Sequence, residues 1–154
     1  MKKLILLLIA VIAMSSIKAQ KISADNVPQP VLDAFKTKFS IAEKTAWEID
    51  YDNYEANFVV GKTDFSGIFD KEGKWLATIT YLKPSELPKN IRESLSKKYG
   101  ELSAYKIEDA IKMEKEKETT YEMEIIRGEN TYEVEFDNEG EMMKEDKKSE
   151  TKKE

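Results

Sequence analysis

The sequence predicts an α+β fold built as a tandem repeat, in which each copy is a helix followed by a four-strand antiparallel meander. The stretch 69–73, Phe-Asp-Lys-Glu-Gly, returns at 136–140 as Phe-Asp-Asn-Glu-Gly. Asp followed three residues later by Gly is typical of a tight turn between strands. An amphipathic segment that opens on proline precedes each copy of the turn, and residues of alternating polarity flank it. The predicted repeats span residues 20–83 and 84–144.

Residues 1–19 are typical of a secretory signal peptide. Lys2 and Lys3 precede an apolar run at 4–14, and the small residue Ala19 marks a suitable cleavage point. The alternative, a membrane anchor, needs about 20 apolar residues, roughly twice this run. The chain has no cysteine for lipid attachment. We therefore expect a periplasmic or secreted protein that is not attached to a membrane after cleavage.

Composition excludes several function classes. The chain has neither histidine nor cysteine, so it lacks the commonest general base, the thiol nucleophile and most ligands of transition metals. Removing Lys2, Lys3 and Lys18 from the 25 basic residues leaves 22 against 30 acidic residues, a net charge of −8. Such a surface disfavours nucleic acid. We expect no cofactor and no catalytic or metal-binding residue.

Each repeat should begin with a helix that buries one face. Pro28 and Pro88 suit the first turn of a helix, and Gly100 suits the end of the second. Apolar residues recur every fourth position, which places them on one helical face: Val31, Phe35 and Phe39 in the first copy, and Ile91, Leu95 and Tyr99 in the second.

A β-hairpin precedes each repeated turn, and the two hairpins predict the same register. In that register the apolar residues face each other on one side of the sheet, and a slip by one residue would send all of them to solvent. The predicted pairs are Tyr54 with Phe69, Ala56 with Gly67, Phe58 with Phe65, Tyr121 with Phe136, Met123 with Val134, and Ile125 with Tyr132.

The remaining segments are assigned by polarity and alternation. Residues 20–26 are polar and predict a flexible lead-in, and the linker 84–88 is short enough that the two sheets should join or pack as one body. An insertion at 112–118 predicts a solvated loop or strand extension. The charged residues 145–154 predict a disordered tail. After the first turn, apolar residues recur at every second position and predict a strand in which Trp75 faces the core. These apolar residues are Trp75, Ala77, Ile79 and Tyr81.

The outward face of the second hairpin carries opposed carboxylates, with Glu122 opposite Glu135 and Glu124 opposite Glu133. Like charges opposed across strands repel, at a cost of about 1 kcal/mol unless basic side chains or a cation lie among them. Three interpretations remain open: a solvated face with interleaved lysines, a surface for a basic partner, and a weak site for a hard cation such as calcium.

The outward face of the first hairpin is mixed in polarity, which suits a protein contact better than an acidic face does; the alternative is a set of scattered surface apolar residues. Its predicted pairs are Glu55 with Ile68, Asn57 with Ser66, and Val59 with Asp64, with Leu76 nearby. Asp70 and Asp137 recur, but turn chemistry explains them. We take Glu122, Glu124, Glu133, Glu135, Val59 and Ile68 as the candidate binding residues.

The pattern of a signal peptide and two copies of helix plus meander, each closing on Phe-Asp-x-Glu-Gly, resembles the PepSY-like family. These are small periplasmic proteins of Bacteroidetes, also described as beta-lactamase-inhibitor-like. The resemblance implies one antiparallel sheet of roughly eight strands with both helices on one face, and a binding or inhibitory module of the periplasm. It carries over no functional residue.

The expected function is therefore that of an exported, non-enzymatic binding module. Its partner would be an unknown protein or peptide, bound through the open sheet face, with the module acting as an inhibitor or in a chaperone-like way. The alternative is a protein that binds calcium or a small ligand through the acidic patch. An exposed edge at the last strand would permit homodimerisation by strand addition.

Overall fold

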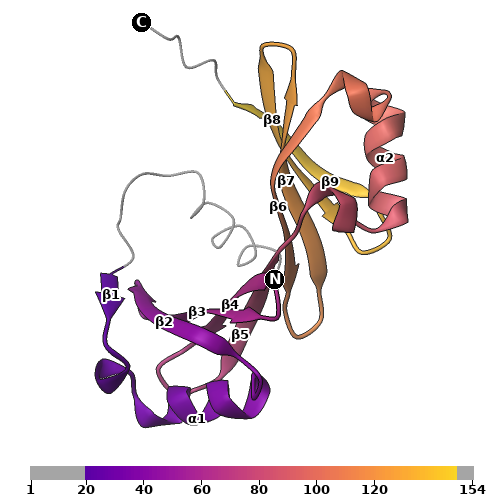
Figure 1. Cartoon of the computed structure of the whole chain (residues 1–154). Coiled ribbons are helices and arrows are strands. Elements are labelled where there is room, and N and C mark those ends of the chain that lie inside the picture. Colours follow the sequence, from indigo (N-terminus) through magenta and orange to yellow (C-terminus); the bar gives the residue numbers. More distant parts are fainter. Residues whose placement is uncertain (1–19, 149–154) are drawn as a thin grey trace, which may run out of the picture.

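The computed structural model describes residues 20–148. The predicted signal peptide and residues 149–154 of the predicted tail lie outside the described residues. Helix α1 (Gln29–Lys38) follows the first strand along the chain, and helix α2 (Lys89–Tyr99) follows the fifth (Figure 1). The strands are β1 (Gln20–Ile22), β2 (Glu43–Asp50), β3 (Asn53–Val60), β4 (Thr63–Phe69), β5 (Trp75–Tyr81), β6 (Lys106–Glu114), β7 (Thr119–Arg127), β8 (Asn130–Asp137) and β9 (Met142–Lys148).

The strands described between residues 20 and 148 form a single nine-stranded sheet in chain order, each antiparallel to the next. The two repeats join where β5 pairs with β6, through Thr78 with Glu114 and Tyr81 with Ile111 at the ends of the ladder. The predicted α+β fold, with the two meanders joined in one sheet, is thereby confirmed.

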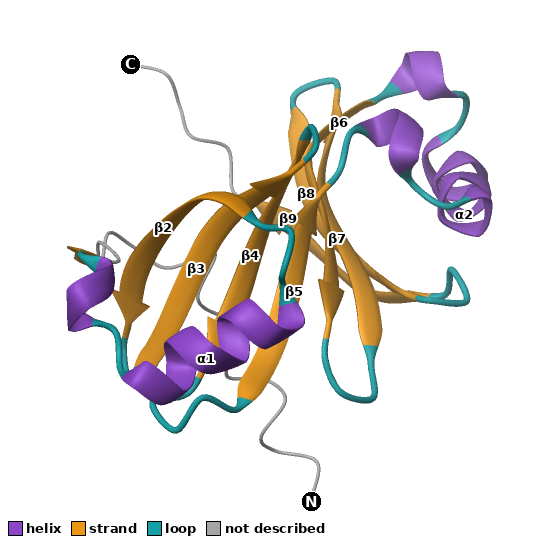
Figure 2. Cartoon of the chain, turned by 60° about the horizontal axis from the view of Figure 1, so that its bottom comes forward, coloured by secondary structure: helices purple, strands orange, loops and turns teal. Residues whose placement is uncertain are grey.

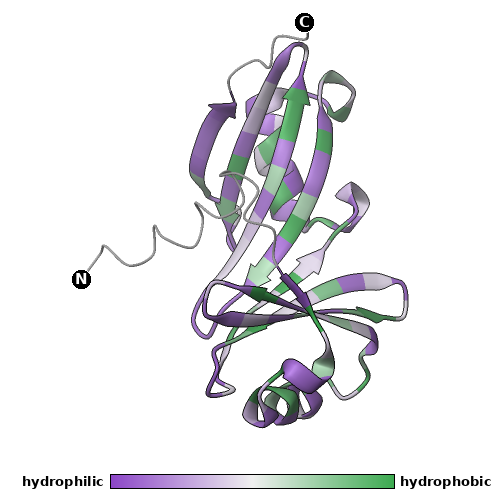
Figure 3. Ribbon diagram, turned by 90° about the vertical axis from the view of Figure 1, so that its left-hand side faces the viewer, coloured by the Kyte–Doolittle hydropathy of each residue, from purple (hydrophilic) through white to green (hydrophobic). Residues whose placement is uncertain are grey.

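Both helices lie on the same face of this sheet, each over its own repeat (Figure 2). Val31 and Phe35 of α1 pack over β2–β5, and Ile91 and Leu95 of α2 pack over β6–β9. The result is two separate apolar cores on one continuous sheet. Along many strands hydrophobic and hydrophilic residues alternate, as Figure 3 shows, because successive side chains point to opposite faces.

The predicted register of both hairpins is confirmed. Tyr54 pairs with Phe69 in the first repeat, and Tyr121 pairs with Phe136 in the second. The other predicted pairs of the two hairpins also occur, on both the helix-bearing face and the face opposite the helices. The face opposite the helices is called the open face below.

The polar segment 20–26 is more ordered than the sequence indicates. Residues 20–22 form β1, which pairs with β2 through Gln20 with Ile49 and Ile22 with Trp47. The side chain of Ile22 packs against the first core. Strand pairing and this one apolar contact account for the order that polarity alone did not predict.

Residues 145–148 are also ordered, contrary to the predicted tail that begins at 145. They extend β9, which pairs with β8 through Val134 with Glu145 and Thr131 with Lys148. Lys98 of α2 binds Glu145 with an N–O distance of 2.7 Å. Backbone pairing along β8 and charge pairing order this segment although it carries no apolar residue. The second repeat therefore extends at least to Lys148.

A bulge changes the face of β5. Phe69 pairs with Trp75, whereas Ile68 pairs with Ala77, so Leu76 is an extra residue. Trp75 stays on the helix-bearing face, where its Nε1 donates to Thr78 Oγ1 at 3.0 Å. The simple alternation predicted from Trp75 to Tyr81 is wrong, because the residues after the bulge point to the other face.

The insertion at 112–118 extends a strand and then turns. Strand β6 runs through Glu114, and the backbone N–H of Lys115 donates to the carbonyl of Glu118 at 2.8 Å to close the turn. The strand begins at Lys106, after a short 3₁₀ turn at Leu102–Ala104. Ile111 and Met113 are buried.

Candidate binding face of the sheet

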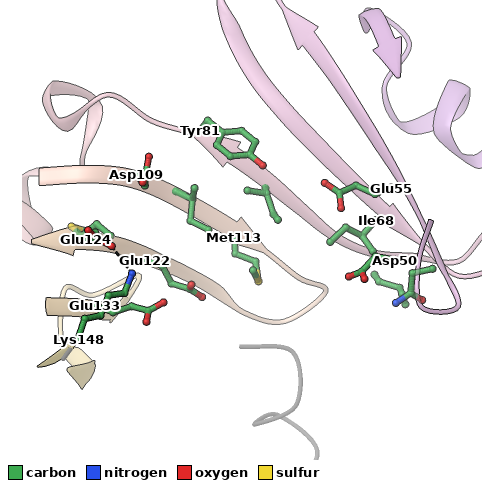
Figure 4. Close-up of a pocket in the computed structure, with 15 residues that line it drawn as sticks. Asp50, Glu55, Ile68, Tyr81, Asp109, Met113, Glu122, Glu124, Glu133 and Lys148 are labelled. Atoms are coloured by element: carbon green, nitrogen blue, oxygen red, sulfur yellow. Dashed lines mark hydrogen bonds and ion pairs between the residues drawn. The ribbon is translucent and has the colours of Figure 1, made fainter. Parts of the chain in front are cut away.

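The open face is hollowed at the junction of the two repeats. A cavity of about 600 Å³ lies there, with walls from both halves of the chain. In Figure 4 the two walls face each other across it, with Glu122, Glu124, Glu133 and Lys148 on one side and Asp50, Glu55 and Ile68 on the other. We call this cavity the hollow. Its volume lies within the ~300–1,000 Å³ typical of ligand pockets.

The floor of the hollow is apolar and is built by the β5–β6 ladder. Ile79 is opposite Met113, and Tyr81 is opposite Ile111. The bulge at Leu76 is what turns Ile79 and Tyr81 to this face. Ile68 of β4 and Leu76 extend the apolar surface into the first repeat.

Acidic side chains line the rest of the hollow. They come from four strands of the two repeats and from the bulge of β6: Asp50, Glu55, Asp109, Glu122, Glu124 and Glu133. Among the described residues, the one basic side chain in the lining is Lys148, which is ion-paired with Glu124. The hollow therefore combines an apolar floor with a strongly negative lining.

Glu122 is the most constrained of these acids. Only 7% of its surface is exposed, and its Oε1 has no hydrogen-bond partner among the residues that the structure describes. Burial raises the pKa of Glu122, and the charges of Glu135 and Glu133 raise it further.

Two other carboxyl groups on the open face are perturbed in the same direction. Burial raises the pKa of Glu135, and Glu118 adds to the effect. Burial likewise raises the pKa of Glu55, with repulsion from Glu48 adding to it. Removing these carboxylates from water penalises their charged form. Both repeats thus hold acids that bind protons more tightly than usual.

Lysines of β9 lie among the glutamates of the second repeat. Lys144 is opposite Glu135 in the β8–β9 ladder, and its Nζ lies 2.7 Å from an oxygen of Asp146. The hydrogen bond to Asp146 raises the pKa of Lys144, and the charges of Glu133 and Glu135 add to this effect. This arrangement supports the interpretation of an acidic face with interleaved lysines. Lys148, which also pairs with a glutamate of this face, lies in the segment expected to be disordered.

The structure brings together most of the predicted binding residues. Ile68, Glu122, Glu124 and Glu133 line the hollow, and Glu135 is buried beside it in a small adjoining pocket with Glu122. Val59 has the predicted pairing with Asp64 but does not line the hollow. Between residues 20 and 148, no group of three or more acidic residues is arranged to hold a metal ion.

The floor residues are the ones that sequence reasoning missed. Ile111 and Met113 alternate with Lys112 and Glu114, and that alternation was the available signal for an outward apolar pair. Ile79 and Tyr81 had no such signal, because their face depends on the bulge.

Asp70 and Asp137 have structural roles. Asp70 Oδ1 accepts the backbone N–H groups of Glu72 at 3.1 Å and Lys74 at 2.8 Å. Asp137 Oδ1 makes the same two contacts one repeat later, at 3.0 and 2.8 Å. Both side chains are therefore used to close turns, as the sequence predicts.

Neither helix of the described part is both long and apolar enough to cross a membrane. Comparison with curated proteins finds no match.

Solved structures with the same fold come from Bacteroides species. A DUF2874 family protein from Bacteroides ovatus is 20% identical, with a TM-score of 0.71 over 80% of this chain and 89% of that one. A BLIP-like protein from Bacteroides fragilis is 22% identical, with a TM-score of 0.69 over 78% and 86%. A protein from Bacteroides eggerthii, described as a putative periplasmic protein, is 19% identical, with a TM-score of 0.70 over 79% and 88%.

The family described as "Putative beta-lactamase-inhibitor-like, PepSY-like" matches residues 13–60 and 52–148, which together span most of the sequence and both repeats. Its description is inhibitor-like and names no enzyme activity. The match agrees with the duplicated helix-plus-meander fold and with the resemblance found in the sequence, and this chain belongs to the PepSY-like family.

Proposed function

We propose that this protein is an exported, non-enzymatic binding module that takes a polypeptide partner on its open face. The observation that carries the proposal is the hollow, which sets an apolar floor inside a polar, charged lining. Helices α1 and α2 cover the opposite face of the same sheet. An apolar patch of this kind on a soluble protein, rimmed by polar groups, is typical of an interaction site.

The family and its neighbours support a binding role without naming a partner. The family description is inhibitor-like, and one neighbour of the same fold is described as BLIP-like. The description of another neighbour as periplasmic agrees with the signal peptide predicted at 1–19. We therefore place the proposed binding event in the periplasm or outside the cell.

A photo-cross-linking experiment tests the proposal. A photoreactive residue is placed at Leu76, at the edge of the hollow, and in a matched variant at Lys97, which is exposed on α2. After irradiation in periplasmic extract, we expect a defined polypeptide adduct from position 76 that position 97 does not form. Equal adducts from both positions, or none from position 76, would contradict binding at the open face.

A small ligand is the second candidate, because the hollow has the volume of a ligand pocket. Native mass spectrometry of the protein purified from its own periplasm distinguishes the two candidates. A bound small molecule lost on Ile79→Lys substitution, with no polypeptide adduct at position 76, would favour the small ligand. Calcium is tested in parallel by its effect on the melting temperature, and a shift abolished by Glu122→Gln would favour a cation site.

A further inference from the structure

Glu122 places a carboxyl group in the wall of the hollow. It lies on β7 opposite Glu135 on one side and opposite Ile111 on the other. Its side chain is 7% exposed, and Oε1 has no hydrogen-bond partner within the described chain. A buried carboxylate without a partner is unfavourable unless it is neutralised or paired. This position is therefore suited to a positively charged group from outside.

The neighbouring lysines are engaged with other acids. Lys148 pairs with Glu124, and Lys144 pairs with Asp146 at 2.7 Å. Lys115 lies 3.8 Å from Glu118. The charges of Lys115 and Lys144 act to lower the pKa of Glu122. Burial and the neighbouring acids outweigh them, so the pKa of Glu122 is raised. The acids of the lining thus exceed the basic groups, and the hollow has an unbalanced negative charge.

The geometry suits an organic cation better than a metal ion. Calcium, a hard metal ion, takes six to eight oxygen ligands that converge on it. The described acids do not form such a group. An ammonium or guanidinium group needs a carboxylate for its head and an apolar surface for its methylene stem. Ile111 lies directly across the ladder from Glu122, and Met113 continues the apolar floor.

We propose that the partner inserts a lysine or arginine side chain, flanked by apolar residues, into the hollow, where its charged group pairs with Glu122. The flanking apolar side chains pack on Ile68, Leu76 and Ile79, which line the hollow and are partly exposed. This inference rests on the proposed function, since it names the chemistry of the polypeptide that the open face binds.

Three synthetic peptides test the inference. They share a short sequence of alternating leucine and serine and differ at the central position, which is lysine, glutamate or serine. Binding to the mature protein is measured near neutral pH by fluorescence polarisation. We expect the lysine peptide to bind about tenfold more tightly than the serine peptide, which corresponds to about 1.4 kcal/mol, and the glutamate peptide to bind most weakly.

Two charge-matched variants locate the effect. Glu122→Gln should weaken binding of the lysine peptide about tenfold and so remove its advantage over the serine peptide. Glu129→Gln removes the same charge from the exposed β7–β8 turn and should change neither. Thermal unfolding of both variants checks that each is folded, and Glu122→Gln should be at least as stable as the parent because it removes a buried charge.

The outcomes separate this inference from the proposed function. Equal binding of the lysine and serine peptides, or no effect of Glu122→Gln, overturns the basic partner while leaving the open face as a binding site. A polypeptide adduct at position 76 without any peptide binding would likewise overturn the basic partner and leave the open face as a binding site. Absence of both peptide binding and the adduct overturns the inference and the proposed function together.

Discussion

At the scale of single residues, Glu122 shows where this protein gives up stability. Its carboxyl group is held beside Glu135 in a largely buried position, and Oε1 has no hydrogen-bond partner within residues 20–148. An apolar or neutral residue there would make a more stable sheet. Groups that cost stability in this way are common at functional sites, because the function requires what folding disfavours.

Glu122→Gln should stabilise the protein. Glutamine keeps the shape of the side chain and removes the charge, so we expect the free energy of unfolding near pH 7 to rise by about 1 kcal/mol. Urea denaturation measures the change. Glu124→Gln is the control, because it removes an acid that is paired with Lys148 and should lower the free energy of unfolding by less than about 1 kcal/mol. A destabilised Glu122→Gln variant would contradict this account.

The advantage of Glu122→Gln should depend on pH. Burial in the folded protein raises the pKa of Glu122 above 4.5, the ordinary value for an unfolded chain. The protonated form therefore contributes stability that is fully present below pH 4.5 and is lost as the pH rises through the higher folded pKa. The variant and the parent should be equally stable below pH 4.5 and should diverge toward pH 7. A difference that does not change between these pH values would argue against a raised pKa.

At the scale of elements, each Asp-x-x-Gly turn packs against the first turn of the helix of its own repeat. A Cβ added to Gly73 would lie 2.5 Å from the carbonyl oxygen of Pro30, and one added to Gly140 would lie 3.1 Å from that of Asn90. Asn90 Nδ2 also donates to the carbonyl of Asn138 at 2.9 Å. The contact explains why the turn and the helix entry recur together in the sequence.

Gly73→Ala should be much more damaging than Gly128→Ala. Both glycines have positive φ, 84° and 59°, so each substitution carries a backbone cost of about 1–2 kcal/mol. An added Cβ at Gly128 meets nothing within 4 Å, whereas at Gly73 it meets backbone. We expect Gly73→Ala to cost at least about 1 kcal/mol more in unfolding free energy, measured by thermal or chemical denaturation. Equal costs would show that the turn does not press on α1.

Asp137→Ala tests the side-chain contacts of the same turn. The substitution removes two hydrogen bonds to backbone N–H groups, of Glu139 and Glu141, and should cost about 1–3 kcal/mol of unfolding free energy. Asp137→Asn retains the Oδ1 acceptor and should cost less than half as much. If the two variants were equally unstable, the charge rather than the hydrogen bonds would be what matters.

At the scale of the whole molecule, two cores share one sheet. Phe35 lies in the first core and Leu95 in the second, and the β5–β6 ladder joins them. Thr78 and Thr80 of that ladder are buried, as are Ile111 and Met113. Separating the repeats would expose this surface and leave two unpaired sheet edges.

The mature protein should therefore unfold in one cooperative transition. Phe35→Ala should cost about 3–5 kcal/mol and Leu95→Ala about 2–5 kcal/mol, and both should lower the same melting temperature. Differential scanning calorimetry with and without each substitution is the measurement. Two transitions, of which Phe35→Ala moves only one, would mean that the repeats fold independently.

Much of the fold is predictable because it is local and periodic. The residues of each hairpin alternate with a period of two, and turn chemistry sets where the strands meet, so the pairs Tyr54–Phe69 and Tyr121–Phe136 follow from the sequence. The opposed glutamates follow from the same register. Order in 20–22 and 145–148 was missed because these segments gain it mainly from pairing with neighbouring strands, with Ile22 as the one apolar contact among them.

The sequence by itself determined the two repeats, the buried face of each helix, the register of both hairpins and the acidic side of the second one. Tertiary structure alone decided where the repeats meet and which face Ile79 and Tyr81 occupy after the bulge at Leu76. It also decided that Glu122 Oε1, beside an apolar floor, has no hydrogen-bond partner in the described part of the chain. The physical reason is the distance along the sequence over which each effect acts. Alternation and turn chemistry act within a few residues, whereas the hollow depends on strands brought together from both halves of the chain.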